Sequence, residues 1–259
     1  MEMELGLQGK KVFITGSTRG IGLATAEAFI QEGAEVVLNG RDERSLHVLS
    51  QRLEKKYDRR VFYLAANILS ENEVSRIKWF LEDTVHGLDI FVANLGSGKP
   101  ESENPLDVKE WKRFYDVNVM GGICVLDQIY PLLKAGKDSS VTLISSIAAK
   151  GVISAPPGYA SAKTAVCTLN KYLSRKWAGD GIRVNCVLPG NVFFQGGRWE
   201  ELLNKDKRGV TEYIESCVPM KRFGEPKEIA DMILFLSSKR ASFITGAEIS
   251  IDGGQLNVM

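Results

Sequence analysis

Cysteine and histidine are scarce in this chain of 259 residues, which has four Cys and two His. No two cysteines form a C-x-x-C pair, so we expect buried free thiols rather than a disulfide framework or a metal site. His47 and His86 fall in predicted surface helices far from any Ser or Cys motif, which argues against a Ser-His or Cys-His hydrolase. The four cysteines are Cys124, Cys167, Cys186 and Cys217.

An excess of one charge is also absent, since 33 basic and 32 acidic residues leave a net charge of +1. This balance argues against a nucleic-acid partner and against a charged tail. No apolar run approaches the roughly 18 residues needed to cross a bilayer. The start, Met-Glu-Met-Glu-Leu-Gly, lacks the basic and apolar regions of a signal peptide. We therefore expect a cytoplasmic protein with no membrane partner.

Apolar strand candidates alternate with helical patterns along the chain, with no linker, internal repeat or low-complexity segment between them. This alternation is typical of βαβ units, in which ligands bind at the carboxyl ends of parallel strands. The sequence predicts an α/β fold over residues 1–259 as one domain, a doubly wound parallel sheet flanked by helices. The strand candidates are Lys11–Thr15, Glu35–Leu38, Val61–Ala65, Leu88–Val92, Val141–Ser146, Arg183–Leu188 and Glu248–Ile251.

A Tyr-x-x-x-Lys spacing occurs three times, and two of the copies have simpler explanations than catalysis. Tyr130 and Lys134 lie late in an apolar helical stretch, where Lys134 fits a solvated cation at a helix end. Tyr172 and Lys176 form another copy, and Tyr172 lies on the same predicted helix as Tyr159. Thirteen residues at about 100° each place these two side chains roughly 140° apart, so they cannot share a site.

The third copy, Tyr159 and Lys163, has a different setting. It follows Ala155–Gly158, a segment that ends one element and opens a helix on which the two side chains stack one turn apart. Upstream, the buried-strand pattern Val141–Ser146 places Ser146 at the carboxyl end of a strand. A lysine ammonium beside a phenol favours the phenolate, so we expect Lys163 to lower the pKa of Tyr159 toward the working range of an acid catalyst. Ser146 can hold the same substrate oxygen by a hydrogen bond.

A glycine-rich turn, Thr15–Gly22, follows the first strand candidate and precedes an amphipathic helical run. The order of strand, glycine turn and helix is typical of dinucleotide sites, where backbone amides approach a pyrophosphate at a helix amino terminus. A tight turn without a ligand is the alternative, and the position of this one favours the dinucleotide. Its glycines are Gly16, Gly20 and Gly22.

The end of the second strand indicates which dinucleotide is bound. Enzymes that bind NAD usually have an acidic residue there, which hydrogen-bonds the ribose hydroxyls. This chain has Leu38–Arg41 instead, with Arg41 after the strand and Arg19 inside the glycine turn. Two guanidinium groups suit a 2′-phosphate, so we expect NADPH rather than NADH, although both could be solvated surface arginines.

With these residues in place, the chain resembles the short-chain dehydrogenase/reductase family from about Leu7 to Gly254. The resemblance implies a single Rossmann-like domain in which a hydride passes between the nicotinamide and a carbonyl or alcohol carbon of a small molecule. The motifs that carry it are Thr15–Gly22, Ala93-Asn94-Leu95-Gly96, Asn118, the set of Ser146, Tyr159 and Lys163, the pair Pro189 and Gly190, and Thr245–Gly254.

The resemblance also implies a role for each site residue. Tyr159 exchanges a proton with the substrate oxygen, Lys163 lowers its pKa and holds the nicotinamide ribose, and Ser146 orients the carbonyl. Asn118 holds a water in the proton relay, and Asn94 braces the central strands. No metal is implied. The cofactor-binding residues are Gly16, Ser17, Thr18, Arg19, Gly20, Ile21, Gly22, Arg41, Asn67, Ile68, Asn94, Gly96, Tyr159, Lys163, Pro189, Gly190 and Val192.

Three departures from the family pattern bear on the site. Leu95 replaces a smaller residue, and we expect it to press on the cofactor floor. Asn67 stands where an Asp often contacts the adenine, and its side-chain carbonyl keeps an acceptor without the charge. The run Asn191–Phe194 lacks the Thr that often contacts the cofactor after Pro-Gly, so the backbone of Val192 is the expected substitute.

The substrate is less constrained than the reaction. The layout is close to that of sugar or polyol dehydrogenases and of 3-oxoacyl carrier-protein reductases. The latter tend to have basic residues beside the site entrance. This chain has Asp180 there, with Lys134 and Lys137 as partial replacements. A small carbonyl compound such as a sugar or keto compound is the expected substrate, and a 3-oxoacyl thioester is the alternative. A dinucleotide-binding sensor or scaffold without turnover is a third reading, which the complete catalytic set disfavours.

Residues 191–219 are polar and helical in places, which predicts a substrate lid or an ordinary surface excursion. Side chains of this segment offer aromatic faces and hydrogen-bond donors suited to sugars or small anions, with packing in the core as the alternative for the two Phe residues. The family resemblance also implies a homotetramer in which helices over 107–134 and 158–178 pack across a two-fold axis. The lid side chains are Phe193, Phe194, Gln195, Arg198 and Trp199.

Overall fold

A seven-stranded parallel sheet organises the computed structural model, which describes residues 4–257. The strand order is β3-β2-β1-β4-β5-β6-β7, so the direction of winding reverses between β1 and β4. In such sheets a crevice forms at this point outside the carboxyl ends of the strands. The strands are β1 (Lys11–Ile14), β2 (Glu35–Gly40), β3 (Val61–Ala65), β4 (Ile90–Ala93), β5 (Ser140–Ile144), β6 (Arg183–Pro189) and β7 (Glu248–Ile251).

All seven predicted strands are present, with ends shifted by at most two residues. Every residue of β4 and β5 is buried, as expected for apolar runs in a parallel sheet that is covered on both faces. The strand β7 lies at the sheet edge and is partly exposed. The predicted α/β fold with a doubly wound parallel sheet is therefore confirmed.

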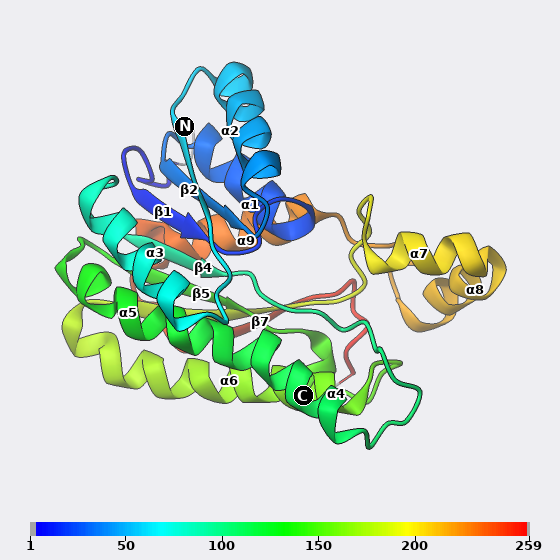
Figure 1. The fold of residues 1–259 in the computed structure, drawn as a ribbon. Helices are drawn as coiled ribbons and strands as arrows, with labels where there is room; N and C mark the ends of the chain where they lie inside the picture. The colour runs from blue at the N-terminus through cyan, green and yellow to red at the C-terminus, as the bar shows by residue number, and fades with distance from the viewer. Residues whose placement is uncertain (1–3, 258–259) are drawn as a thin grey trace.

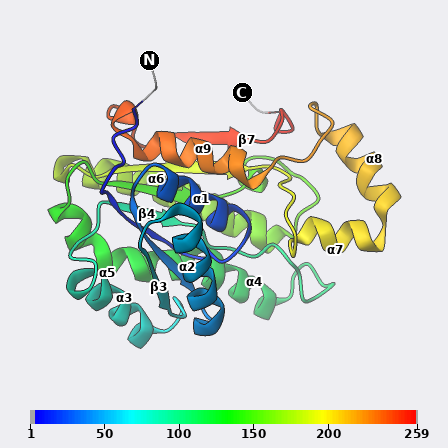
Figure 2. The same cartoon turned by 90° about the horizontal axis from the view of Figure 1, so that it is seen from above.

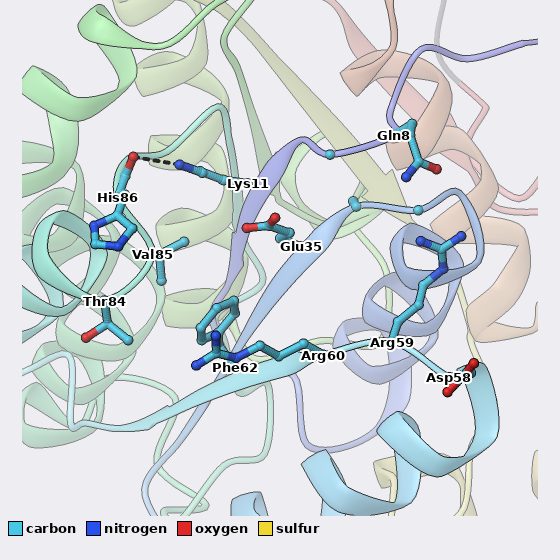
Figure 3. Close-up of a pocket in the computed structure, with 13 residues that line it drawn as sticks. Gln8, Lys11, Glu35, Asp58, Arg59, Arg60, Phe62, Thr84, Val85 and His86 are labelled. Atoms are coloured by element: carbon cyan, nitrogen blue, oxygen red, sulfur yellow. Dashed lines mark hydrogen bonds between the residues drawn. The ribbon is translucent and has the colours of Figure 1, made fainter.

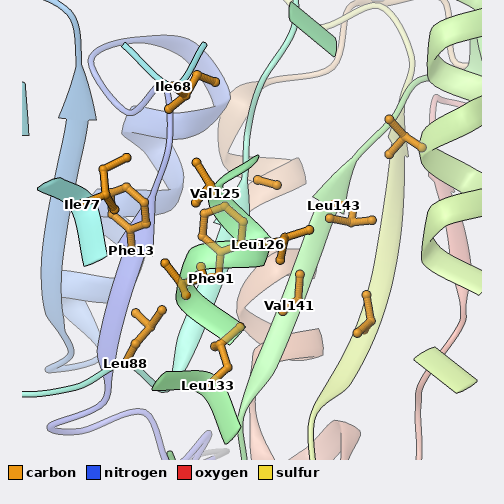
Figure 4. Close-up of a cluster of buried hydrophobic side chains, with 14 of the residues drawn as sticks. Phe13, Ile68, Ile77, Leu88, Phe91, Val125, Leu126, Leu133, Val141 and Leu143 are labelled. Carbon is orange, nitrogen blue, oxygen red and sulfur yellow. The ribbon is translucent and has the colours of Figure 1, made fainter. Parts of the chain in front are cut away.

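Helices cover both faces of the sheet (Figures 1 and 2). The helices α1, α2 and α9 pack on one face, and α3, α5 and α6 pack on the other. On the second face Phe13 and Phe91 stack with their ring centroids 5.6 Å apart, against α3 and α5 (Figure 4). The helices of the two layers are α1 (Gly20–Gln31), α2 (Glu43–Tyr57), α3 (Glu71–Asp83), α5 (Gly121–Ala135), α6 (Pro157–Trp177) and α9 (Pro226–Ser237).

The segment predicted as one helix over 107–134 is interrupted. It consists of α4 (Val108–Tyr115), a π-helical turn η1 (Asp116–Met120) and α5. A π-turn adds one residue to a helical turn and is frequent at functional sites, because it redirects the side chains around it. The second predicted helix, over 158–178, is the uninterrupted α6.

The 191–219 segment contains two helices, α7 (Arg198–Lys205) and α8 (Lys207–Cys217), which project from the body of the molecule (Figure 1). We refer to residues 191–219 as the lid segment. Among residues 4–257, no helix has both the length and the apolar character needed to cross a membrane.

Two predictions about single residues were wrong. His86 lies outside α3, in a turn with a positive φ of 62°, rather than in a helix. Cys217 is exposed at the end of α8 because that helix projects into solvent, and Cys124 is only half-buried, whereas Cys167 and Cys186 are buried as expected. All four cysteines are free thiols.

Candidate active site

The glycine turn connects β1 to α1 and is braced by β4. Gly16 has φ of +60°, and a Cβ on it would lie 2.6 Å from the carbonyl oxygen of Asn94. The Asn94 side-chain amide donates to the carbonyls of Gly16 and Thr15, at 3.0 and 3.2 Å. A Cβ on Gly22 would lie 2.5 Å from the same Asn94 amide nitrogen. Only glycine therefore lets the turn pack this closely against β4, and Asn94 has the bracing position expected for it.

No side chain caps the amino end of α1, and the ring of Phe194 lies against Gly20 there. The N-cap residue, Arg19, makes no side-chain cap, and the first turn of α1 contains no acidic residue. By contrast, Asp42 caps α2 and Asp107 caps α4. The backbone amides at the start of α1 and the positive end of its dipole are thus available to an anion. The turn fits the pyrophosphate of a dinucleotide.

The other predicted residues of the turn differ in what they offer a ligand. Ser17 is buried, and its hydroxyl accepts from the amide of Asn39 in β2 at 2.8 Å, so it connects the turn to the sheet. The methyl group of Thr18 packs toward Gly40. Arg41 follows Gly40 and is exposed, with no acidic residue at the end of β2.

Asn67, predicted to contact the adenine, and Ile68, predicted to bind the cofactor, follow β3. The side-chain oxygen of Asn67 accepts from the amide of Leu69 at 3.2 Å, and its second lone pair leaves an acceptor for a cofactor. The side chain of Ile68 is buried in the core and lies against Gly121 of α5. The exposed side chain of Asn67 is accessible to a nucleotide, whereas Ile68 offers mainly its backbone.

Ser146, Tyr159 and Lys163 come together at the carboxyl end of β5. Ser146 lies just beyond the strand, where its hydroxyl accepts from the amide of Ala148 at 3.2 Å. Tyr159 is in the first turn of α6, which begins at Pro157 with the fixed φ that suits this position. Lys163 follows one turn later. The structure therefore brings together the catalytic residues predicted from the sequence.

Lys163 is buried and held by the backbone. Its ammonium group donates to the carbonyls of Leu95 and Ile144, each at 2.9 Å. Burial disfavours the charged form and lowers the pKa of Lys163 to about 8. The carbonyl of Lys163 itself accepts from the hydroxyl of Ser145 at 2.8 Å. Both ends of this residue are thus fixed to the sheet.

The prediction that Lys163 lowers the pKa of Tyr159 was wrong. Burial raises the pKa of Tyr159, and the hydroxyl of Ser146 lowers it only in part. The ammonium of Lys163 lies 5.8 Å from the centroid of the Tyr159 ring and is directed at two carbonyls instead. The phenol therefore remains protonated at neutral pH, which suits a proton donor.

Asn118 lies in the π-turn η1 and is buried. Its amide nitrogen donates to the carbonyls of Phe114 and Ser97, at 2.9 and 3.3 Å, while its side-chain oxygen has no partner among the residues described. A Cβ on Gly96 would lie 2.5 Å from this oxygen and 2.8 Å from the nitrogen of Lys163. The free acceptor is in the right place to bind a water near Lys163.

Leu95, which we expect to press on the cofactor floor, is half-buried and packs against the core. A Cβ on Gly122 of α5 would lie at an ordinary contact distance, 3.9 Å, from its side chain. The backbone carbonyl of Leu95 accepts from Lys163 at 2.9 Å. A contact of the Leu95 side chain with the cofactor stays a prediction.

The segment after β6 joins the sheet to the lid segment. A Cβ on Gly190 would lie 2.7 Å from the side chain of Asp252, so the chain approaches the residue after β7 closely there. Val192 is buried and forms a bridge with Gly224. The side chain of Asn191 donates to Gln255 at 2.7 Å, and Gln255 in turn donates to Tyr213 of α8 at 2.9 Å.

The aromatic residues of the lid segment mostly pack on one another. Trp199 lies 5.7 Å from Tyr213 and 5.2 Å from Phe223, and Phe193 lies 5.9 Å from Phe223, between ring centroids. Phe193 is half-buried and belongs to neither core cluster, so it packs on Phe223 and not in the core that was given as its alternative. Phe194 is separate from this cluster and lies against Gly20 of the glycine turn.

An ion pair across the site entrance was missed by the sequence analysis. Lys99, in the loop after β4, pairs with Glu201 of α7 at 2.9 Å. The carbonyl of Lys99 also accepts from Arg113 of α4 at 2.7 Å. The partners are 102 residues apart, and no local pattern marks two common surface residues as a pair.

Asp180, placed by the sequence analysis beside the site entrance, lies elsewhere. It precedes β6, beyond the carboxyl end of α6, about 30 Å from Tyr159 along a helix of this length. There it pairs with Lys134 at 2.8 Å and accepts from the hydroxyl of Tyr130 at 2.7 Å. Lys134 is therefore paired rather than simply solvated, and Tyr172 is exposed on α6.

A cavity of about 580 Å³ also lies away from Tyr159 (Figure 3). It is at the amino ends of β1 to β3, where Lys11 donates to the carbonyl of His86 at 2.6 Å and Arg60 lies 4.3 Å from the ring of Phe62. Glu35 adds a negative charge to its wall. Its mixed charges and position separate it from the candidate active site.

Comparisons with known proteins agree with this geometry. A short-chain dehydrogenase family model, described as enoyl-(acyl carrier protein) reductase, matches residues 16–255. L-fucose dehydrogenase of Oryctolagus cuniculus is 33% identical over 254 residues, covering 95% of this chain and 84% of the relative. The 3-oxoacyl-[acyl-carrier-protein] reductase of Aquifex aeolicus is 30% identical over 253 residues, covering 97% and 99%.

A solved structure is also similar over nearly the whole chain. The L-sorbose reductase from Gluconobacter frateurii, complexed with NADPH and L-sorbose, has a TM-score of 0.91 and 31% identity, covering 99% of this chain and 100% of that one. Matches of this extent show that the chain belongs to the short-chain dehydrogenase/reductase family and is an oxidoreductase that acts on alcohol and carbonyl groups.

Proposed function

We propose that this oxidoreductase uses NADPH to reduce the carbonyl group of a small polar compound such as a sugar or another keto compound. The observation that carries the proposal is the meeting of Ser146, Tyr159 and Lys163 at the carboxyl end of β5, at the same edge of the sheet as the uncapped amino end of α1. When bound, NADPH supplies a hydride to the carbonyl carbon.

The residues of the chain provide the rest of the chemistry. The protonated phenol of Tyr159 donates a proton to the substrate oxygen, and the hydroxyl of Ser146 orients that oxygen. The Lys163 ammonium, fixed by two carbonyl acceptors, has a third N–H available for a ribose hydroxyl. The free side-chain oxygen of Asn118 accepts from a water that can return a proton toward the site.

The preference for NADPH rests on Arg19 and Arg41. Both lie at the adenosine end of the expected cofactor position, and no acidic residue stands at the end of β2 to favour ribose hydroxyls. Arginine binds phosphate through two parallel hydrogen bonds. NADPH in the similar L-sorbose reductase supports the same coenzyme.

Fluorescence titration with NADPH and NADH tests the coenzyme. We expect NADPH to bind at least about tenfold more tightly, and Arg41→Ala to reduce that difference, since a charge-assisted pair contributes about 1.5–3 kcal/mol. The variant Arg44→Ala, on the exposed face of α2, is the control. Tighter binding of NADH to the wild-type protein would reject the proposal.

The substrate is tested by following NADPH oxidation with aldoses, keto sugars, diketones and acetoacetyl thioesters. Relatives that act on L-fucose and L-sorbose support the sugars. A 3-oxoacyl thioester is the second candidate because of the similar carrier-protein reductase. Turnover of acetoacetyl thioesters alone would establish that second candidate in place of the first.

The assembly and setting of the protein complete the proposal. The chain acts as one domain over 1–259, with residues 191–219 as its lid, and forms a homotetramer through α4, α5 and α6. Analytical ultracentrifugation at micromolar concentration tests the tetramer, and a monomer there would exclude it. We place the protein in the cytoplasm, because four free thiols suit a reducing compartment.

A further inference from the structure

The lid segment contacts the glycine turn through a short stretch, Phe194–Gly197. The guanidinium nitrogen Nη1 of Arg19 donates to the carbonyl of Gly196 at 2.8 Å. Beside it, a Cβ on Gly20 would lie 2.8 to 3.0 Å from ring atoms of Phe194, so the ring packs directly on the glycine backbone. The same two turn residues that approach the cofactor are thus in contact with the lid.

Two glycines shape this stretch for its contact. Gly196 has a φ of +74°, and its amide donates to Glu200 at 2.7 Å. The amide of Gly197 donates back to the carbonyl of Phe194 at 3.1 Å, and a Cβ on Gly197 would lie 2.9 Å from that carbonyl oxygen. The turn therefore directs the Gly196 carbonyl and the Phe194 ring toward α1 together.

Arg19 retains most of its binding capacity in this arrangement. A guanidinium has five N–H donors, and among the described residues Arg19 uses only Nη1, on a neutral carbonyl. No carboxylate in the described part of the chain pairs with it, so its charge is not neutralised. Its Nε and second amino group form an edge that can bind two oxygens of a phosphate, as arginine commonly does.

We propose that the stretch Phe194–Gly197 is a determinant of coenzyme specificity: by holding Arg19 through the Gly196 carbonyl, it prepares the guanidinium to bind the 2′-phosphate of NADPH. The inference rests on the proposed preference for NADPH. A side chain that is already oriented loses less freedom on binding, so the phosphate binds more tightly when the lid is docked. By reciprocity, a 2′-phosphate on Arg19 stabilises the docked lid, and a coenzyme without that phosphate does not.

A double-mutant cycle on binding tests the inference. We expect Phe194→Ala to weaken the binding of NADPH about fivefold to tenfold and the binding of NADH less than about twofold, since only the 2′-phosphate depends on the oriented guanidinium. In an Arg19→Ala background the same substitution should leave the ratio of the two dissociation constants unchanged. Phe194→Leu keeps an apolar side chain on Gly20 and should restore much of the discrimination. Arg208→Ala, on the exposed side of α8, is the control, and it should change neither of the two dissociation constants.

Hydrogen exchange measures the coupling without turnover. We expect 2′,5′-ADP to slow exchange of backbone amides in 194–217 and 5′-ADP to leave them unchanged. Phe194→Ala should remove that protection. If Phe194→Ala weakens the binding of NADPH and of NADH equally, the ring contacts only the part that the two coenzymes share, and the inference is overturned. Equal exchange with both nucleotides overturns it too.

The two proposals fail in distinguishable ways. The wild-type protein alone decides the coenzyme preference, and tighter binding of NADH would reject that preference together with the inference. If the wild-type protein prefers NADPH but the preference is insensitive to Phe194→Ala, the proposed function stands and only the role of the lid is rejected.

Discussion

The two sides of the candidate site are held by different interactions. On the side of β5 and α6, Lys163 is buried, and hydrogen bonds to backbone carbonyls fix it and Asn118. We refer to Asn118, Ser146, Tyr159 and Lys163 as the catalytic wall. On the opposite side, α7 is connected by the ion pair of Lys99 with Glu201, whose side chains are 56% and 42% exposed.

This difference separates the chemistry from the choice of substrate. Backbone hydrogen bonds in a buried core hold reacting groups within the narrow geometry that catalysis requires. Exposed ion pairs contribute about 0–1 kcal/mol each, so the lid segment can adjust to a ligand at small cost. Substitutions in the catalytic wall should therefore change turnover greatly, and loss of the exposed pair of Lys99 with Glu201 should change binding slightly.

The largest effect is expected from Tyr159→Phe. Removing the proton donor should lower kcat about 10³-fold, since general acid catalysis contributes roughly 10² to 10⁴. The dissociation constant for NADPH should stay within about twofold, because the aromatic ring still packs on Phe114, 6.1 Å away. Steady-state kinetics measures kcat, and fluorescence titration measures the dissociation constant.

Tyr172→Phe is the matched control for that substitution. It removes the same hydroxyl from an exposed side chain of the same helix and should leave kcat unchanged. If the Tyr159→Phe protein kept more than a tenth of wild-type turnover, another group would have to donate the proton. If the wild-type protein itself showed no turnover, the result would support a dinucleotide-binding sensor instead of an enzyme.

Gly96→Ala should be the next most damaging change. The new Cβ would lie 2.5 Å from the Asn118 oxygen and 2.8 Å from the Lys163 nitrogen, at a φ of +149° that side chains rarely adopt. Displacing these groups by a fraction of an ångström should lower kcat/KM about 10²-fold. Gly179→Ala is the control, because a Cβ there has no atom within 4 Å. Similar kcat/KM values for the two variants would refute the idea of a rigid catalytic wall.

Local patterns predicted much of the catalytic wall. Ser146 ends an apolar strand, and Tyr159 and Lys163 are one turn apart on a helix that opens with Pro157, so short-range spacing was enough to bring them together. The sheet followed from the alternation of strands and helices for the same reason. The π-turn around Asn118 could not be predicted, because the apolar pattern continues through it without a break.

The lid contacts could not be predicted from the sequence, because they join distant parts of the chain. Arg19 and Gly196 are 177 residues apart, and neither residue type marks the other as a partner. The pKa of Tyr159 was misjudged for a related reason: burial depends on the whole fold, whereas the spacing to Lys163 is local.

The pH dependence of reduction should report the buried ammonium of Lys163. Its pKa is lowered to about 8, so the charged form is present below that pH and is lost as the pH rises through it. The phenol of Tyr159, with its pKa raised by burial, stays protonated over the same range. We expect kcat/KM to fall about tenfold per pH unit above pH 8, measured with NADPH in excess.

Lys163→Arg gives the control for this profile. Arginine keeps its charge at every pH of the assay, so any remaining activity should lose the limb near pH 8. A wild-type profile that stays flat to pH 9.5 would show that the charge of Lys163 is not required in this range, and that the catalytic wall works through position alone.

The smallest effect is expected from Glu201→Gln on the lid. Loss of the ion pair with Lys99 should raise KM about twofold to threefold and leave kcat unchanged, because an exposed pair contributes under about 1 kcal/mol. The effect should disappear in 1 M salt, where such pairs are screened. Glu212→Gln, which breaks the exposed pair with Arg208 on α8, should change neither constant. A fall in kcat equal to the rise in KM would mean that α7 positions the reacting groups, and the division between a rigid catalytic wall and an adjustable lid would then have to be abandoned.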